Sequence, residues 1–575
     1  MDVIQLKKQL SVNLLNMFDT IFQNHGLNDN DIFLLFEYPP EREFGDLALP
    51  CFRFGKIFKK SPVQIAQIIK DNFQDDNIIK TEAVNGFLNF YIKYGYYINE
   101  VMPGILTLKE KYGNADTGDN KTVVLDYSSP NVAKPFHIGH IGTTIIGHSL
   151  RLLHEKAGYK CIGINYLGDW GTQFGKLIAA YNLWGDKQKI IDGGIDELVD
   201  LYVRFHSEAE KDSSLEEKAR NDFLKLEQGD AGNIALWKWF IEISLTEYEK
   251  TYDQLNIKFD SYSGESHSYK ITKPVIDELK EKGLLKKDGG AELVYLDEYK
   301  MPPCMILKSD GSTIYASRDI AEVLSRKKTY NFDKAVYVTS AAQSLYFAQL
   351  FKVVELMGYE WAKEQLIHVP YGTFSVNGEK LSTRSGNVVL LKDLFRMAIE
   401  KVREIIDEKN PGLIDKEETA EAVGVGAVVF HYLMNNRIKD VNFILEDALN
   451  FDGNTGPYAQ YTYARTCSIL EKGRNTDIAD EFNGYVPCAE EMNVLRILYL
   501  YPEKIAEALK EYEPSVITRY IIDICVNFNR FYHECQIINA EKQIQREFRI
   551  RLTNAVNIIL KDALNLICLK TPEKI

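Results

Sequence analysis

Hydrophobic and polar residues recur with two different periods along this 575-residue chain, and the period changes mark domain boundaries. Residues 1–105 combine the helical pattern of "SPVQIAQIIKDNF", in which Ser61 is the expected N-cap and Pro62 the first helical residue, with the strand-like "GFLNFYIKY". The polar, turn-rich "NADTGDNK" then precedes "TVVLDYSS", a β-branched run typical of a buried strand. These patterns predict an α+β module over 1–105 and a new domain from about residue 120.

The second region has the pattern of an α/β domain. "TTIIGHSLRLLHEKAG" is apolar at helical spacing, and "YKCIGINYLGDWG" is expected to supply the next strand, which gives a strand–helix–strand unit. Residues 177–300 are charged and are expected to form a helical insertion. Strands are expected to return in "STIYASRDI", "KAVYVTSAAQS" and "IHVPYGTFSV". We therefore predict a Rossmann-like, doubly wound parallel sheet over 120–405.

The third region is predicted to be entirely helical. Long amphipathic segments such as "EMNVLRILYLYPEKIAEALKEY" and "SVITRYIIDICVNFNRFYHEC" follow one another, and no further strand is expected after about residue 410. The predicted fold is thus an α/β domain with a doubly wound parallel sheet, between an N-terminal α+β module and an all-α C-terminal domain over 410–575.

Composition is that of a water-soluble globular protein, with 45% hydrophobic and 26% charged residues. No apolar run approaches the length of a membrane span or a signal peptide, so a cytoplasmic protein without membrane contact is expected. The net charge of -14 by itself counts against a nucleic-acid partner. Residues 541–575, however, hold seven basic and four acidic side chains, which suits either phosphate contact or a solvated helix face. Eight cysteines occur singly and never as CxxC, so no metal site is predicted.

The most informative local motif is "SSPNVAKPFHIGH" at 128–140. His137 and His140 share one face of the expected helix, and Gly139 between them lets a flat ring approach the backbone. A helix that begins beside a doubly wound sheet presents free N–H groups and a positive dipole to phosphate. Imidazoles that donate to phosphate oxygens would stabilise the charge that develops in nucleotidyl transfer. A capped helix with two partly exposed histidines, or a metal site without a third ligand nearby, remain alternatives.

Several separated motifs point to one family. "HIGH" and, about 240 residues later, "GEKLSTRSGN" resemble the HIGH and KMSKS signatures of class I aminoacyl-tRNA synthetases. The segments "LDYSSPNVAKPFHIGH", "GDWGTQFG", "YASRDI", "GNTGPYAQYTYAR" and the ending "TPEKI" are similar, in order and over essentially the whole chain, to arginyl-tRNA synthetases. The resemblance implies ATP-dependent ligation of L-arginine to tRNA(Arg) through an arginyl-adenylate, with Mg²⁺ accompanying ATP, by a monomer.

The resemblance also implies roles for individual residues. A guanidinium needs carboxylates placed for bidentate hydrogen bonds, and the matching positions for arginine are Asp126, Asn131, Tyr315, Asp319 and Gln343. Asp319 with Tyr315 is expected to hold the guanidinium. The expected ATP-binding set is His137, Gly139, His140, Lys134, Lys380 and Ser382, in which Lys134 supplies the charge that Thr383 lacks in the second signature. For tRNA the expected contacts are Phe87 and Asn89 to the D-loop, and Tyr458 and Tyr461 to the anticodon.

One departure and two rival functions stay open at this point. Gly142 stands where the family usually has an arginine, and the sequence does not say what replaces it. An HxGH-type nucleotidyltransferase acting on a small metabolite would explain an ATP site but not a large helical C-terminal domain. A catalytically inactive tRNA-binding paralogue is the other alternative, which Gly142 and Thr383 hint at.

Overall fold

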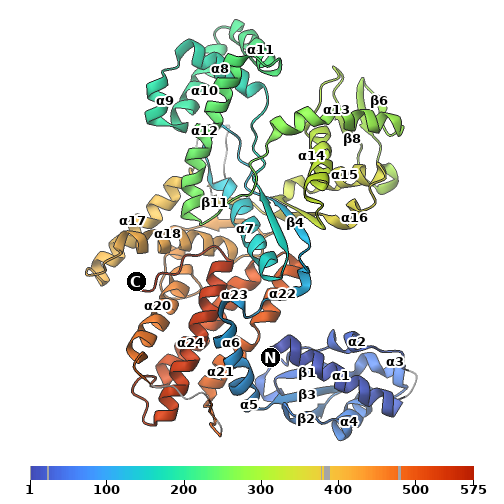
Figure 1. Ribbon diagram of the computed structural model, residues 1–575, viewed down its shortest axis with the longest axis vertical. Helices are drawn as coiled ribbons and strands as arrows, with labels where there is room; N and C mark the ends of the chain where they lie inside the picture. The colour runs from blue at the N-terminus through green and yellow to red at the C-terminus, as the bar shows by residue number, and fades with distance from the viewer. Residues whose placement is uncertain (1, 23–24, 377–378, 381–388, 477–480, 483) are drawn as a thin grey trace.

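The computed structural model describes residues 2–22, 25–376, 379–380, 389–476, 481–482 and 484–575. Figure 1 shows an elongated molecule in which the N-terminal module lies beside the C-terminal helices, and the catalytic sheet lies between those helices and two further lobes. Within the described residues, no helix is both long and apolar enough to cross a bilayer.

The N-terminal module is an antiparallel sheet covered by helices, as predicted. Its strands are β1 (Leu47–Pro50), β2 (Ile78–Val84) and β3 (Phe87–Ile92), in the order β1-β3-β2, and its helices are α1 (Val3–Phe22), α2 (Asp29–Phe33), α3 (Gly55–Phe58) and α4 (Pro62–Asn72). Ser61 caps α4 by accepting from the backbone N–H of Gln64 at 3.3 Å. Alternate β3 residues Leu88, Phe90 and Ile92 are buried in the core. The helices α5 (Tyr94–Tyr96) and α6 (Met102–Leu108) that follow share a core with the C-terminal domain.

The predicted doubly wound parallel sheet is confirmed. Its order is β10-β9-β4-β5, formed by β4 (Thr122–Asp126), β5 (Lys160–Ile164), β9 (Lys334–Ser340) and β10 (Leu366–Tyr371), all parallel. Helix α7 (Ile141–Lys156) connects β4 to β5. The chain leaves β4 toward β5 on one side and returns to β9 on the other, so the strand order reverses beside β4. That switch point is where open α/β sheets bind ligands, beyond the carboxyl ends of their strands.

One expected strand is a helix. The segment "STIYASRDI" was predicted to return to the sheet, but Tyr315 begins α14 (Tyr315–Tyr330). Its buried residues Ala316, Ile320 and Val323 follow helical spacing, and the Ser317 hydroxyl accepts from the backbone N–H of Ile314 at 3.1 Å to close the first turn. The nine residues of this segment contain too few apolar positions to distinguish the helical period from the strand period.

The insertion is helical at first and then forms a small sheet of its own. The helices are α8 (Thr172–Trp184), α9 (Lys187–Gly193), α10 (Ile195–Ala209), α11 (Ser214–Glu227), α12 (Ala231–Gln254) and α13 (Glu265–Glu281). Strands β6 (Lys286–Asp288), β7 (Ala291–Val294) and β8 (Cys304–Leu307) follow as an antiparallel sheet, so the expectation of helix up to residue 300 was wrong for its last part. Helices α15 (Ser344–Leu356) and α16 (Ala362–Gln365) cover the catalytic sheet from the same lobe.

The C-terminal region is a helical bundle, as predicted, with one exception. Its helices are α17 (Leu391–Lys409), α18 (Lys416–Leu433), α19 (Leu445–Ala448), α20 (Gly456–Gly473), α21 (Ala489–Tyr499), α22 (Tyr501–Glu511), α23 (Ser515–Glu534) and α24 (Gln543–Leu566). Strand β13 (Val441–Phe443) pairs in parallel with β11 (Phe374–Val376), which also pairs with β12 (Glu379–Lys380), so strands do occur after residue 410. Strand β13 has only three residues and pairs with a strand from the preceding domain, so it is too short to show an alternating pattern in the sequence.

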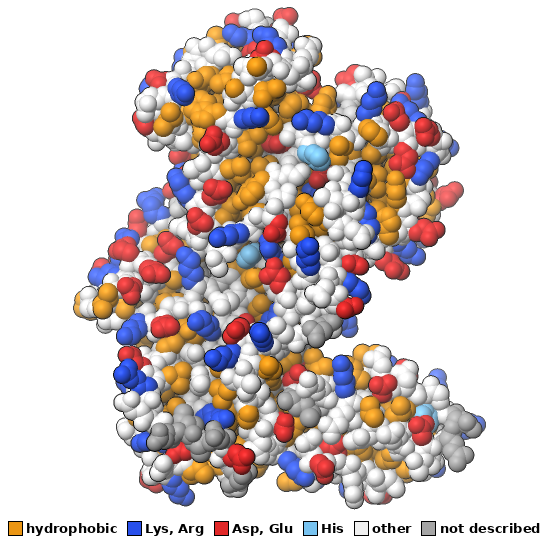
Figure 2. Space-filling view, viewed as in Figure 1, with side chains coloured by type: hydrophobic (Ala, Val, Ile, Leu, Met, Phe, Trp, Pro, Cys, Tyr) orange, Lys and Arg blue, Asp and Glu red, His pale blue; other side chains and the backbone are white. Residues whose placement is uncertain are grey.

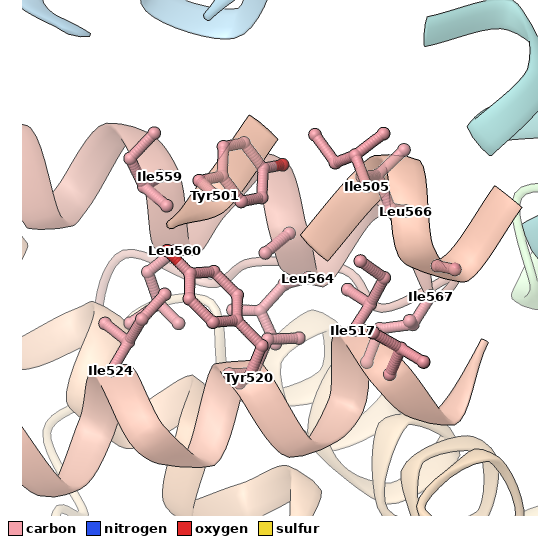
Figure 3. Packing of buried hydrophobic residues seen from close by; sticks show 14 of the residues in the cluster. Tyr501, Ile505, Ile517, Tyr520, Ile524, Ile559, Leu560, Leu564, Leu566 and Ile567 are labelled. Carbon is pink, nitrogen blue, oxygen red and sulfur yellow. The ribbon is translucent and has the colours of Figure 1, made fainter. Parts of the chain in front are cut away.

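The bundle core is built from large buried side chains. Figure 3 shows Tyr501 and Tyr520 among aliphatic residues of α23 and α24; their ring centroids lie 5.7 Å apart and nearly parallel. After α24 the chain returns to the catalytic domain, where the Ser149 hydroxyl of α7 donates to the Leu566 carbonyl at 2.7 Å. The bundle and the sheet are therefore one packed body, which fixes the start of α7 relative to the C-terminal helices.

Candidate functional site

A cavity of about 460 Å³ lies at the switch point of the catalytic sheet. It opens between the carboxyl ends of β4 and β9, the start of α7 and the first turns of α14. All five residues expected to bind arginine line it, together with two of the expected ATP-binding residues: Asp126, Asn131, Tyr315, Asp319, Gln343, Gly139 and His140. A larger cavity of about 1360 Å³, between the second half of α7 and the C-terminal tail, contains none of the predicted residues.

The two histidines form a compact pair at the start of α7. His137 caps the short turn Ile138–His140, where its Nδ1 accepts from the backbone N–H of Gly139 at 3.1 Å, and the two imidazole centroids lie 3.9 Å apart. Burial lowers the pKa of His137 and lowers that of His140 to about 3, and the positive charge of Lys134 contributes to both shifts. Both rings are therefore neutral at pH 7. A neutral imidazole whose Nδ1 accepts carries its proton on Nε2, so His137 offers a hydrogen-bond donor, without a charge, to a phosphate. The Nδ1 of His140 lies 3.2 Å from both the backbone N–H and the carbonyl of His137.

Two carboxyl groups face the same cavity from different helices. Asp319, in the first half of α14, accepts a hydrogen bond from the Tyr346 hydroxyl, and burial raises its pKa to about 6. Glu265, at the start of α13, pairs with Arg318 at 2.9 Å, and burial raises its pKa to about 7. The charge of Asp319 raises the pKa of Glu265 further, so a cation placed between the two carboxyl groups would favour both ionised forms. Glu265 was missed by the sequence reasoning because no local motif surrounds it.

Asp126 is held in place by a buried ion pair. Its Oδ2 accepts from the Arg326 guanidinium at 2.6 Å and its Oδ1 accepts from the Ser129 hydroxyl at 3.0 Å. Arg326 is 3% exposed and also donates to Glu322 at 3.1 Å. Glu322 and Arg326 line the cavity but were not predicted; their spacing of four on one helix is the signal that could have found them.

The remaining expected arginine-binding residues lie at the rim. Asn131 is exposed just after β4, and a side chain at Gly168 would overlap its amide oxygen. Gln343 ends the turn after β9 and is also exposed. Tyr315 is 64% exposed, with the Arg318 guanidinium 5.1 Å from its ring centroid. Such exposed polar groups are placed to contact a ligand that extends out of the cavity.

Of the two lysine side chains expected at the ATP site, that of Lys134 lies within the described residues and that of Lys380 does not. Lys134 is exposed, and its carbonyl accepts from the Tyr248 hydroxyl at 2.7 Å, which fixes the turn before the histidines. Lys380 occupies strand β12, paired with Ser375, while its side chain lies outside the described residues, as do Ser382 and Thr383.

The space beside Gly142 is filled by two tyrosines. A Cβ at this position would overlap the hydroxyl of Tyr432 from α18 and would lie 3.0 Å from the ring of Tyr371, at the end of β10. Tyr371 also lines the cavity. The room that an arginine would need is therefore occupied by aromatic side chains in this chain.

The residues expected to contact tRNA differ in their accessibility. The Phe87 ring lies 5.1 Å from the half-exposed Phe52 ring, whereas Asn89 on the same strand is only 4% exposed. In α20 the Tyr458 hydroxyl accepts from the Asn529 amide at 3.0 Å. Tyr461 is 42% exposed, with the Arg465 guanidinium 5.1 Å from its ring centroid. Tyr461 and the Phe52–Phe87 pair are the surfaces best suited to stacking on a base.

Comparisons with known proteins cover nearly the whole chain. The catalytic domain of class I tRNA synthetases (R) matches residues 101–445, the arginyl tRNA synthetase N-terminal domain matches 5–92, and the DALR anticodon binding domain matches 459–575. The chain is 48% identical to an arginine–tRNA ligase of Halothermothrix orenii, over 97% of this chain and 99% of that one. It is 45% identical to the arginine–tRNA ligase of Alkaliphilus metalliredigens, over 96% and 97% of the two chains.

Solved structures show the same fold. The arginyl-tRNA synthetase of Thermus thermophilus superposes with a TM-score of 0.81 at 24% identity, over 94% of this chain and 96% of that one. The arginyl-tRNA synthetase of Plasmodium falciparum superposes with a TM-score of 0.78 at 24% identity, over 98% of this chain and 99% of that one.

Proposed function

Because this chain belongs to the arginyl-tRNA synthetase family, we infer that it joins L-arginine to tRNA(Arg), using ATP and passing through an arginyl-adenylate. The observation that carries this inference is the single cavity onto which the start of the HIGH helix and a pair of carboxyl groups both open. One wall suits phosphates and the other suits a guanidinium. A nucleotidyltransferase acting on a small metabolite would not need the N-terminal and DALR domains that match 5–92 and 459–575.

The amino-acid half of the proposal rests on charge. Asp319 and Glu265 accept from the guanidinium of arginine, which matches carboxylates in a bidentate geometry. Tyr315 closes over this group from the rim. Asn131 and Gln343 orient the α-amino and carboxylate ends. Asp126 is immobilised by Arg326, so it acts on the substrate as a fixed acceptor, at no cost of reordering.

The nucleotide half rests on the neutral histidine pair. His137 and His140 donate from Nε2 to the phosphate oxygens of ATP, and the free N–H groups at the start of α7 add to the stabilisation of developing charge. Gly139 leaves room for adenine. Lys134 supplies a point charge beside these rings, as its effect on their pKa values supports. Lys380 and Ser382 act from the second signature.

Magnesium enters, in this proposal, as a complex with ATP. No cluster of three metal-ligating side chains lies in this cavity among the described residues. Mg²⁺ keeps waters and binds phosphate oxygens rather than a protein cage, so this donor set fits a cation carried in by ATP. Bound with ATP, Mg²⁺ would neutralise part of the negative charge of the phosphates.

The outer domains would hold the tRNA. We assign residues 1–105 to the D-loop through Phe87 and Asn89, residues 120–405 with the 177–300 insertion to catalysis, and residues 410–575 to the anticodon through Tyr458 and Tyr461. Figure 2 shows the molecule hollowed between the N-terminal module and the catalytic domain, with charges of both signs interspersed over this face. A monomer in the cytoplasm is the state we propose.

ATP–pyrophosphate exchange with each of the twenty amino acids, in the presence and absence of tRNA, tests the proposal. Arginine alone should support exchange, and arginylation of tRNA(Arg) should follow. Exchange with a different amino acid, or adenylation of a small metabolite without tRNA transfer, would favour the nucleotidyltransferase alternative. Tight tRNA binding without exchange under any condition would identify an inactive paralogue.

A further inference from the structure

Three potential metal ligands meet far from the active site, in the C-terminal bundle. Cys488 is the N-cap of α21, Glu490 lies in the first turn of that helix, and Cys535 ends α23. The two sulfur atoms are 3.6 Å apart, and the three ligand atoms lie within 4.8 Å of one another. The cysteines are 47 residues apart, so the single cysteines of the sequence gave no sign of the pair.

The sulfur–sulfur distance suits a shared metal ion. Two thiolates on a tetrahedral Zn²⁺, each with a bond of about 2.3 Å, lie about 3.8 Å apart. A disulfide would require the sulfurs to approach to about 2.05 Å and would give the carboxylate of Glu490 no role. Both thiols are free in this structure.

The surrounding charges leave Glu490 available as the third ligand. The neighbouring carboxylate, Glu491, is fully buried and already accepts from the Cys488 backbone N–H at 2.9 Å, the Tyr485 hydroxyl at 3.0 Å and Arg549 at 2.7 Å. No hydrogen bond or ion pair engages the Glu490 side chain within the described part of the chain. Arg549 is paired with Glu491 at 2.7 Å, so its positive charge is balanced there.

The accessibility of the three groups also fits a bound cation. Cys535 is buried, whereas Cys488 and Glu490 are half-buried, so the three groups form a shallow site with one open side. The Cys488 sulfur faces the backbone N–H of Glu491 at the start of α21.

We propose that Cys488, Cys535 and Glu490 bind one Zn²⁺, with water in the fourth position. Binding replaces the two thiol protons, which are released to solvent, by two Zn–S bonds. Two thiolates and one carboxylate carry three negative charges against the two positive charges of Zn²⁺, so the occupied site carries one net negative charge. The ion fastens the start of α21 to the end of α23 and so stiffens the bundle that matches the DALR domain.

Full-length protein, reduced and stripped with a chelator, tests the site. Titration with Co²⁺, followed by the sulfur-to-cobalt charge-transfer absorption, should show one equivalent bound, and Zn²⁺ should displace it. Cys488→Ser and Cys535→Ser should each weaken binding at least tenfold and reduce the charge-transfer band, and Glu490→Gln should weaken binding while keeping the band. Cys467→Ser, which removes a half-buried thiol of the same bundle, is the matched control and should bind like the wild type.

A measurement on the unmodified chain protects the test against variants that fail to fold. One equivalent of Zn²⁺ should protect two thiols from Ellman's reagent and raise the melting temperature. Absence of stoichiometric Co²⁺ and Zn²⁺ binding by the reduced wild type would overturn the proposal. So would unchanged affinity in both serine variants. If mass spectrometry finds a Cys488–Cys535 disulfide after mild oxidation while the reduced protein binds no metal, the pair is a redox site instead.

Discussion

Replacing Asp319 by asparagine should separate arginine recognition from ATP binding. The substitution keeps the size and one acceptor oxygen of the side chain, and the Tyr346 hydroxyl can still donate to that oxygen. What is lost is the negative charge opposite the guanidinium. Breaking a buried ion pair costs about 3–5 kcal/mol, and the lower figure applies because Asp319 is only partly buried until arginine covers it. At 1.4 kcal/mol per factor of ten, kcat/KM for arginine should fall about a hundredfold.

The pH dependence of this effect has a definite sign. Burial raises the folded-state pKa of Asp319 to about 6, above its unfolded value, so the folded protein without substrate holds this proton more tightly and loses stability as pH rises toward 6. Arginine requires the ionised form. Its kcat/KM in the wild type should therefore decline as pH falls below about 6, and that part of the decline should vanish in the variant. At pH 7 the substrate-free variant should melt at a slightly higher temperature than the wild type.

Arginylation and pyrophosphate exchange over a range of arginine concentrations, at pH 5.5 to 8, measure these effects, with KM for ATP and the melting temperature as controls. Glu265→Gln provides a comparison. Because Glu265 already pairs with Arg318, this substitution should lower kcat/KM for arginine less than Asp319→Asn does. A fall of less than tenfold in kcat/KM for Asp319→Asn, or an equal rise in KM for ATP, would refute the assignment of Asp319 to the guanidinium.

Three other perturbations test separate parts of the molecule. Lys134→Ala should slow adenylate formation more than tenfold in single-turnover assays with little change in melting, and adding Thr383→Lys should restore part of the rate; a normal rate in Lys134→Ala would show that this charge is not used. Gly142→Ala should lower stability by about 1–3 kcal/mol in urea unfolding, because the added methyl overlaps the Tyr432 hydroxyl. Deleting residues 1–92 should raise KM for tRNA while cooperative unfolding of the remainder persists; an unchanged KM would remove the module from tRNA binding.

Some features of the chain were predictable because they depend on neighbours in sequence. The cap of α4 at Ser61, the amphipathic helices of the bundle and the strand–helix–strand unit around α7 each follow from a local pattern. The HIGH and "GEKLSTRSGN" segments identified the family for the same reason, since each motif is a short run of residues. Asp319 and Tyr315 could be named as candidates because they stand in one such motif.

Other features depend on contacts that no local pattern records. Glu265 enters the cavity because α13 follows the insertion back to the sheet, and Arg326 reaches Asp126 across 200 residues of sequence. The expected strand at "STIYASRDI" failed because packing on the sheet favoured a helix there. Burial, which the sequence does not state, makes His140 neutral and keeps Asp319 close to its titration point.

The division between features that the sequence predicts and features that it does not follows from the range of the forces involved. Backbone dihedral preferences and amphipathic periods act over a few residues, so the sequence by itself determined the bundle helices, the strands of the catalytic sheet and the family motifs. Desolvation and ion pairing depend on which distant side chains share a cavity. Only the tertiary structure therefore decided the protonation of the site, the partners of Asp126 and the meeting of Cys488 with Cys535.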